Sequence, residues 1–256
     1  MTTRRAFLAG AAATGTITLL PFRVQAAGHA AHDSFATANG EILITPKSHA
    51  SFVMESPVGT IYVDPVGEPA MYEDMPTPDL ILITHEHGDH YNADTLAALM
   101  GDDTVMITNP AVYDMLPADM QAKATALANG ESGSFGDATI DAIPAYNITE
   151  GRENFHPQGR DNGYVVTIDG FRTYISGDTE DTPEMRALEN IDLAFVCMNL
   201  PFTMDATAAA SAVSAFAPTY VYPYHYRGRD NGTQDPAEFA EMLEGDIEAK
   251  MGAWYG

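Results

Sequence analysis

The sequence predicts an α/β protein made of two similar halves, and three observations support this class. Each half opens with short strand patterns and then alternates strand with helix, which is typical of layered α/β folds. The run Leu80–Ile83 is apolar throughout, as expected for a strand that a sheet covers on both faces. A block of histidine and carboxylate side chains follows this run directly, at the edge where such sheets bind ligands.

In the first half, the strand that precedes this block is expected to be a buried one. Asn92 or Asp94 can cap the helix after the block, because a short polar side chain there accepts a hydrogen bond from a free backbone N–H. The segment 122–127 fits neither a helix nor a strand pattern clearly. The pattern predicts strands at 41–46, 50–55, 60–64, 80–83 and 105–108, with helices at 92–100 and 110–116.

The second half repeats this order. Asp169 and Gly170 are typical of a tight hairpin between two strands. Asp235 followed by Pro236 is typical of the start of a helix. We expect the segment 220–223 to be the last strand. The pattern predicts strands at 138–143, 164–168, 171–176, 191–198 and 220–223, with helices at 180–188, 206–216 and 235–248.

Residues 1–27 resemble a twin-arginine export signal. Arg4 and Arg5 precede a weakly apolar, alanine-rich stretch at 9–20, and small residues at its end offer a cleavage site. The apolar stretch has about half of the ~20 residues that are needed to span a bilayer. We therefore expect the twin-arginine machinery to export the folded chain to the periplasm, leaving residues 28–256 as one domain.

The charge of the chain excludes several kinds of partner. Residues 1–27 hold three of the 12 basic side chains and none of the 36 acidic ones, so the remaining chain has a formal charge of −27. Such a surface repels the phosphates of nucleic acids and of anionic membranes. We expect no nucleic-acid partner, no membrane partner and a small-molecule substrate. The sequence indicates no particular oligomeric state.

The block after Leu80–Ile83 has the composition of a metal site. His85, His87 and His90 are three of only eight histidines in the chain, and Asp89 lies among them. Imidazole nitrogens and carboxylate oxygens are ligands that suit zinc, iron and manganese. A solvated polar loop is the alternative, but it does not explain the clustering. The pattern His-x-His-x-Asp-His, with its apolar strand before and helix after, resembles the signature of the metallo-β-lactamase superfamily.

This resemblance covers nearly all of residues 28–256 and implies a four-layer αββα sandwich. It also implies two divalent metal ions, with zinc expected first and iron or manganese as alternatives. Asp178 and His225 each follow a late strand, where the superfamily places its bridging aspartate and its last histidine. The implied ligands are His85 and His87 for the first metal, Asp89, His90 and His225 for the second, and Asp178 between them.

The sequence departs from the superfamily at one ligand of the first metal. A histidine normally lies on the loop after the strand predicted at 138–143, but Asn147 occupies about that place. An amide oxygen competes poorly with imidazole for zinc. Either His156 reaches in from the same loop, or water and Asn147 hold the first metal weakly. We favour His156; its alternative role is to line the substrate cleft.

Several further residues are expected around these ligands. Asp64 ends the strand at 60–64, where it can support a ligand histidine or simply begin a turn before Pro65. Two arginines are notable because basic residues are scarce in this chain, and they could bind an anionic group of a substrate. The candidate substrate contacts are Asn147, Tyr146, Tyr224, Tyr226, Arg227 and Arg229.

The resemblance implies a hydrolase in which two metal ions activate a water, and Asp89 orients that water or returns a proton to the leaving group. The bond would be an ester, lactone, amide or phosphodiester in a small substrate. The alternatives are a metal-dependent binding or scavenging protein without turnover, and a di-iron redox protein. A β-lactamase activity is also compatible with the motif, because a fold does not fix the chemistry.

Overall fold

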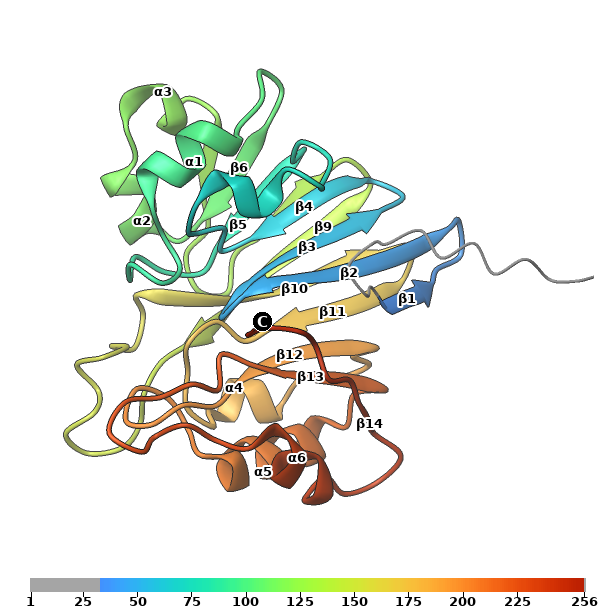
Figure 1. The fold of residues 1–256 in the computed structure, drawn as a ribbon, viewed down its shortest axis with the longest axis vertical. Coiled ribbons are helices and arrows are strands. Elements are labelled where there is room, and N and C mark those ends of the chain that lie inside the picture. The colour runs from blue at the N-terminus through green and yellow to red at the C-terminus, as the bar shows by residue number, and fades with distance from the viewer. Residues whose placement is uncertain (1–32, 256) are drawn as a thin grey trace, which may run out of the picture.

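Residues 33–255 form two seven-stranded sheets packed face to face, with helices on both outer faces (Figure 1). This computed structural model confirms the expected four-layer sandwich. The export signal expected at 1–27 lies outside the described residues. Within residues 33–255, no helix has the length and apolar character needed to cross a membrane.

The first sheet has the strand order β1-β2-β3-β4-β5-β6-β7. Strands β1 to β4 pair antiparallel, and β4 to β7 pair parallel. The parallel strands therefore all end at the same edge of the sheet. Their bounds are β1 Asp33–Ala36, β2 Glu41–Ser48, β3 Ser51–Ser56, β4 Gly59–Val63, β5 Leu80–Ile83, β6 Val105–Thr108 and β7 Ala124–Ala126.

The second sheet has the order β14-β13-β12-β11-β10-β9-β8 and repeats the pattern of the first. Strands β8 to β11 pair antiparallel, and β11 to β14 pair parallel. The two similar halves are thus confirmed. The bounds are β8 Ser132–Phe135, β9 Ala138–Ala145, β10 Asp161–Ile168, β11 Phe171–Ile175, β12 Leu193–Cys197, β13 Tyr220–Tyr224 and β14 Glu248–Ala249.

The helices begin where the sequence places capping residues. The side chain of Asn92 accepts a hydrogen bond from the backbone N–H of Thr95, and that of Asp235 from the N–H of Ala237. Helices α1 to α3 cover the first sheet and α4 to α6 cover the second (Figure 1). The bounds are η1 Pro69–Tyr72, α1 Ala93–Leu99, α2 Pro110–Met115, α3 Ala118–Gln121, α4 Pro183–Arg186, α5 Ala206–Phe216 and α6 Pro236–Glu241.

The predictions of secondary structure were wrong mainly at the edges of the sheets. The strand at 220–223 is not the last one, because β14 pairs with it. The helix expected at 235–248 ends at Glu241, and the one expected at 180–188 covers only Pro183–Arg186. Strands β1 and β8 were not predicted. Edge strands of two to four residues are too short to show a hydrophobic period.

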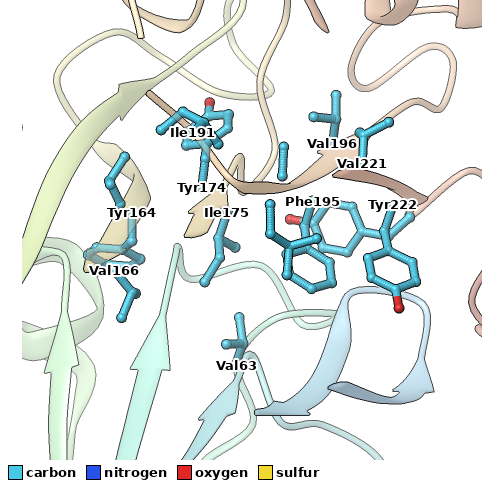
Figure 2. Close-up of a cluster of buried hydrophobic side chains, with 14 of the residues drawn as sticks. Val63, Tyr164, Val166, Tyr174, Ile175, Ile191, Phe195, Val196, Val221 and Tyr222 are labelled. Atoms are coloured by element: carbon cyan, nitrogen blue, oxygen red, sulfur yellow. The ribbon is translucent and has the colours of Figure 1, made fainter. Parts of the chain in front are cut away.

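Apolar side chains fill the space between the sheets. Phe52 of β3 stacks on Phe195 of β12, with ring centroids 4.1 Å apart, and Phe195 stacks in turn on Tyr222 of β13 at 5.1 Å. Figure 2 shows Val63 of the first sheet pointing toward Ile175 and Phe195 of the second. Burying each such side chain contributes roughly 1.5–3 kcal/mol. This core holds the two sheets in a fixed relation at the edge where their parallel strands end.

Candidate metal centre

The ends of the parallel strands deliver the polar residues of the site. In the first sheet, Asp64 follows β4, and the block 85–90 follows β5. In the second sheet, Asp178, Asn199 and His225 follow β11, β12 and β13. The two sheets thus bring residues that are far apart in the sequence to one edge, as the fold predicts for ligand-binding residues.

All six histidines within residues 33–255 lie around this one point. The ring centroid of His85 is 4.0 Å from that of His90 and 5.2 Å from that of His156. The ring of His225 is 5.0 Å from His90 and 3.7 Å from His49. Three sets of donor atoms lie close enough together to bind a metal ion: His85, His87 and His156; His85, His90 and Asp178; and His49, Asp89 and His225.

Asp178 lies between two groups of these histidines. Its Oδ1 atom is 3.4 Å from His90 Nε2 and 3.6 Å from His225 Nε2. Its Oδ2 atom is 3.4 Å from His156 Nε2. One carboxylate oxygen therefore faces each group. This is the arrangement that a carboxylate bridging two metal ions requires.

Several atoms at this point are buried without a hydrogen-bond partner in the described part of the chain. They are Nε2 of His90, His156 and His225, and Oδ1 of Asp178. A buried polar atom without a partner is costly, and native structures rarely leave one unexplained. Four such atoms in one place fit a bound cation, because a cation would satisfy all of them. The donor set therefore fits divalent metal ions.

Neighbouring side chains orient two of the rings. The Nδ1 atom of His90 is 2.7 Å from Asp64 Oδ2, and Asp64 is itself fixed by hydrogen bonds from the backbone N–H and the hydroxyl of Thr84. The Nδ1 atom of His156 is 3.3 Å from Asn147 Oδ1. With Nδ1 occupied in this way, each ring presents Nε2 to the metal position. Asp64 thus supports a histidine, which was one of its two predicted roles.

The structure separates the alternatives that were open for Asn147 and His156. Asn147 is buried, and its amide donates hydrogen bonds to the carbonyl oxygens of Phe202 and Arg152 at 2.7 and 3.1 Å. Its amide is therefore directed into the loop, and Asn147 is not among the residues that line the cleft described below. His156 joins His85 and His87 instead.

Burial and nearby charges shift the pKa values of the site in different directions. Burial lowers the pKa of His85 well below its ordinary value and also lowers that of His87. Burial acts in the same direction on His90, but two carboxylates, Asp178 foremost, outweigh it and raise its pKa well above the ordinary value. Burial raises the pKa of Asp178, but the adjacent histidines outweigh it and hold it well below its usual range. Asp178 is thus ionised at neutral pH, and His90 must release a proton to bind metal.

Three residues of the site have left-handed backbone conformations. The φ angles are 50° at His49, 43° at Asp64 and 52° at His225. Such angles are uncommon outside glycine and cost energy, and they are concentrated at functional sites. Each occurs one residue after a strand, at the point where the chain turns.

A cleft of about 520 Å³ opens beside these residues, which is a size that suits a small molecule. Arg227 and Arg229 lie on its wall, as predicted for substrate contacts. Its lining consists of His49, His87, Gly88, Asp89, Phe155, His156, Asp178, Asn199, Phe202, His225, Arg227, Gly228 and Arg229.

The three tyrosines expected to contact substrate do not line this cleft. Tyr224 is fully buried, because its position on β13 directs it into the core beside Phe52. The hydroxyl of Tyr146 donates a hydrogen bond to Glu184 instead. Tyr226 packs against Tyr255. The expectation was wrong for Tyr224, because closeness to a ligand in sequence does not fix the side on which a side chain lies.

His49 is the principal residue of the cleft that sequence reasoning missed. Its Nδ1 atom is 2.5 Å from the hydroxyl of Tyr255, and its Nε2 atom is 3.5 Å from Asp89 Oδ2. Asn199 was also missed, although its side-chain amide lies 2.9 Å from His225 Nδ1. Both are single polar residues after a strand, and such residues carry no local signal of function.

Comparison with known proteins agrees with this geometry. Residues 43–225 match the β-lactamase superfamily domain. The chain belongs to this superfamily. A UPF0173 metal-dependent hydrolase of Anaeromyxobacter sp. (strain K) is 30% identical over 234 residues, which cover 84% of this chain and 85% of the relative. The comparisons therefore place the chain among the metal-dependent hydrolases of the superfamily.

Solved structures extend the comparison. A provisionally assigned metal-dependent hydrolase from Parabacteroides distasonis is 40% identical and has a TM-score of 0.78, with 88% of this chain and 99% of that chain covered. The di-iron β-hydroxylase CmlA from Streptomyces venezuelae is 17% identical and has a TM-score of 0.64. The match covers 82% of this chain and 53% of CmlA. At that identity, the likeness shows only a shared fold.

Proposed function

We propose that this superfamily member is a hydrolase that holds two divalent metal ions and cleaves an ester, lactone, amide or phosphodiester bond in a small substrate. One observation carries the proposal. The six histidines of residues 33–255 and the carboxylate of Asp178 converge on one cleft, with four buried atoms left without a hydrogen-bond partner.

The two oxygens of Asp178 divide the donors into two metal positions. We assign His85, His87 and His156, which lie together, to the first position. We assign Asp89, His90 and His225 to the second, because His90 and His225 both face Asp178 Oδ1 and Asp89 lies beside His225, and Asp178 is shared between the two positions. Donor sets rich in imidazole suit zinc, although iron and manganese accept the same ligands. We propose zinc as the resident ion.

When bound, such a pair of ions supplies a nucleophilic water at neutral pH and polarises the bond under attack. The chain itself supplies the proton carrier. Asp89 is half-exposed in the cleft, with Oδ2 3.3 Å from His225 Nε2. Burial raises the pKa of Asp89, but the adjacent imidazoles of His225 and His49 outweigh it and hold that pKa far below the ordinary value. Asp89 is therefore ionised, so it can orient a water, accept a proton from that water and then pass the same proton to a leaving group.

The substitution His87→Ala tests the proposal. The variant should remain folded by far-UV circular dichroism, contain less metal than the wild type, and lose activity toward every substrate that the wild type cleaves. The substrates are chromogenic esters, lactones, phosphodiesters and β-lactams, measured with metal-loaded protein. Turnover by His87→Ala at the wild-type rate would contradict the assignment.

The specific reason to consider a binding protein without turnover was a half-filled first metal position. The closeness of His156 to His85 and His87 supports a complete first metal position and argues against this alternative. The redox alternative is distinguished by the metal itself. Two equivalents of zinc with hydrolysis support the proposal, whereas two equivalents of iron without hydrolysis would favour redox chemistry.

We further propose that the mature chain works in the periplasm after twin-arginine export. The support is the pattern of Arg4, Arg5 and the stretch at 9–20. Replacing Arg4 and Arg5 by lysine should retain the chain in the cytoplasm, as measured by cell fractionation. Unchanged export of this variant would contradict the proposal.

A further inference from the structure

We propose, on the basis of the hydrolase assignment, that the substrate carries an anionic group, a carboxylate or a phosphate, which Arg227 and Arg229 bind at the wall of the cleft. Both arginines lie on residues 226–234, named here the arginine loop, which follows β13 and His225. Both are exposed.

The first argument is the lack of an internal partner for these two charges. The chain has 36 acidic and only 12 basic side chains. Arg152, Arg160 and Arg186 each form a salt bridge with a carboxylate, whereas Arg172 forms none with any described residue but lies on β11, outside the cleft. Within residues 33–255, neither arginine of the loop forms one, although both line the same cleft as Asp89. Two arginines that have no carboxylate partner among these residues, and that both lie on the wall of this cleft, indicate that their partner is a ligand.

The second argument is that the arginine loop is held in place. The carbonyl of Leu200 accepts a hydrogen bond from the N–H of Arg229, and the N–H of Leu200 donates one to the carbonyl of Gly232. A Cβ atom on Gly228 or Gly232 would lie 2.3 or 1.9 Å from the oxygen of Leu200. Only glycine permits this close approach. The loop is therefore pre-organised, which reduces the entropic cost of binding.

The third argument is the position of the two guanidinium groups. That of Arg227 lies 4.1 Å from the ring centroid of Tyr255, and that of Arg229 lies 5.6 Å from the ring of Phe202. A guanidinium that lies over an aromatic ring keeps its N–H groups free to bind a carboxylate or phosphate. The hydroxyl of Tyr255 is also 2.5 Å from His49 Nδ1. Because His49 lines the cleft, Tyr255 holds Arg227 close to the metal centre.

The overall charge strengthens this inference. A chain with a net charge of −24 repels anions at long range. An anionic substrate would therefore need a local positive site close to the reacting bond, and the arginine loop is that site. Phe155 and Phe202, whose centroids are 5.1 Å apart, line the same cleft and offer an apolar surface for the rest of a small molecule.

A pair of matched esters tests the inference. Para-nitrophenyl acetate is neutral, and mono-para-nitrophenyl succinate adds a carboxylate to the same leaving group. The wild type should cleave the succinate ester with the higher kcat/KM. The double variant Arg227→Gln, Arg229→Gln should lose about ten- to a hundredfold of kcat/KM on the succinate ester, mainly through KM, because hydrogen bonds to charged groups contribute about 1.5–3 kcal/mol. Hydrolysis of the acetate should change little.

Arg186→Gln is the matched control, because it removes an arginine that lies outside the cleft. It should leave both esters unaffected. An equal loss on both esters in the double variant, or no loss on either, would overturn the inference while leaving the hydrolase intact.

A binding measurement separates this inference from the proposed function. Isothermal titration calorimetry with phenylphosphonate and with succinate, on metal-loaded protein, needs no turnover. Each probe should bind the double variant at least about tenfold more weakly than the wild type and the Arg186→Gln control. Weaker binding of one probe alone would show which anion the site prefers. If neither ester is cleaved, the proposed hydrolysis of esters fails, and equal affinities in this titration would then overturn anion binding as well.

Discussion

The two sheets have the same strand order but supply the cleft in different ways. The first sheet gives four donors from one loop, since residues 85–90 follow β5 directly. The second sheet gives single residues after separate strands: His156 after β9, Asp178 after β11 and His225 after β13. The first contribution depends on one turn of the chain. The second depends on the register of a whole sheet, because three strands must end at the same level.

Substitution of Asp178, the carboxylate that follows β11 of the second sheet, should have the largest effect on metal content and activity. Asp178→Ala removes a carboxylate whose two oxygens each face one proposed metal position, so both metal ions should be lost. We expect kcat/KM to fall by more than about a thousandfold. Removing one group that stabilises charge in the transition state commonly lowers the rate by about a hundred- to a thousandfold, and this variant should lose two metal ions. Asp181→Ala is the control, because that carboxylate lies three residues on and pairs with Arg186. Full metal content in Asp178→Ala would contradict the division into two positions.

The loop after β9 should show the next largest effect. His156→Ala should lose the ion of the first position and retain that of the second, giving about one equivalent of metal per chain. Asn147→Ala should instead weaken metal binding by about tenfold, since Asn147 orients His156 without facing the cleft. Competition with a chelator measures both. Unchanged metal content in His156→Ala would show that this histidine lines the cleft and does not bind metal.

A smaller effect is expected from the carboxylate that supports the first sheet's block. Asp64→Asn should lower metal affinity by about ten- to a hundredfold, because Asp64 orients His90. Since carboxylates raise the pKa of His90, metal binding at neutral pH must displace its proton, and affinity should fall as the pH is lowered. In Asp64→Asn the pKa of His90 is raised less, so fewer protons should be released.

Calorimetry in buffers of different ionisation enthalpy counts these protons. Asp102→Asn, an exposed carboxylate before β6, is the control and should match the wild type. Equal proton release in wild type and Asp64→Asn would contradict the role given to this contact.

The same contrast explains what the sequence could reveal. The block at 85–90 was recognisable because its histidines are clustered, and β5 because it is apolar. Asp178 and His225 were found only through the resemblance to a known superfamily, since an isolated Gly-Asp or histidine after a strand is common. His49 had no such support, and only its contacts in the folded chain, with His225 and Asp89, reveal it. Tyr224 was wrongly placed because the side on which a strand residue lies depends on the packing of the sheets.

The most direct test of the account is a crystal structure of the metal-loaded protein with anomalous scattering recorded at the absorption edge of the bound metal. We predict two peaks on either side of the Asp178 carboxylate, one among His85, His87 and His156 and the other among Asp89, His90 and His225. A single peak, or peaks away from Asp178, would contradict the central claim that the two sheets together hold a pair of metal ions.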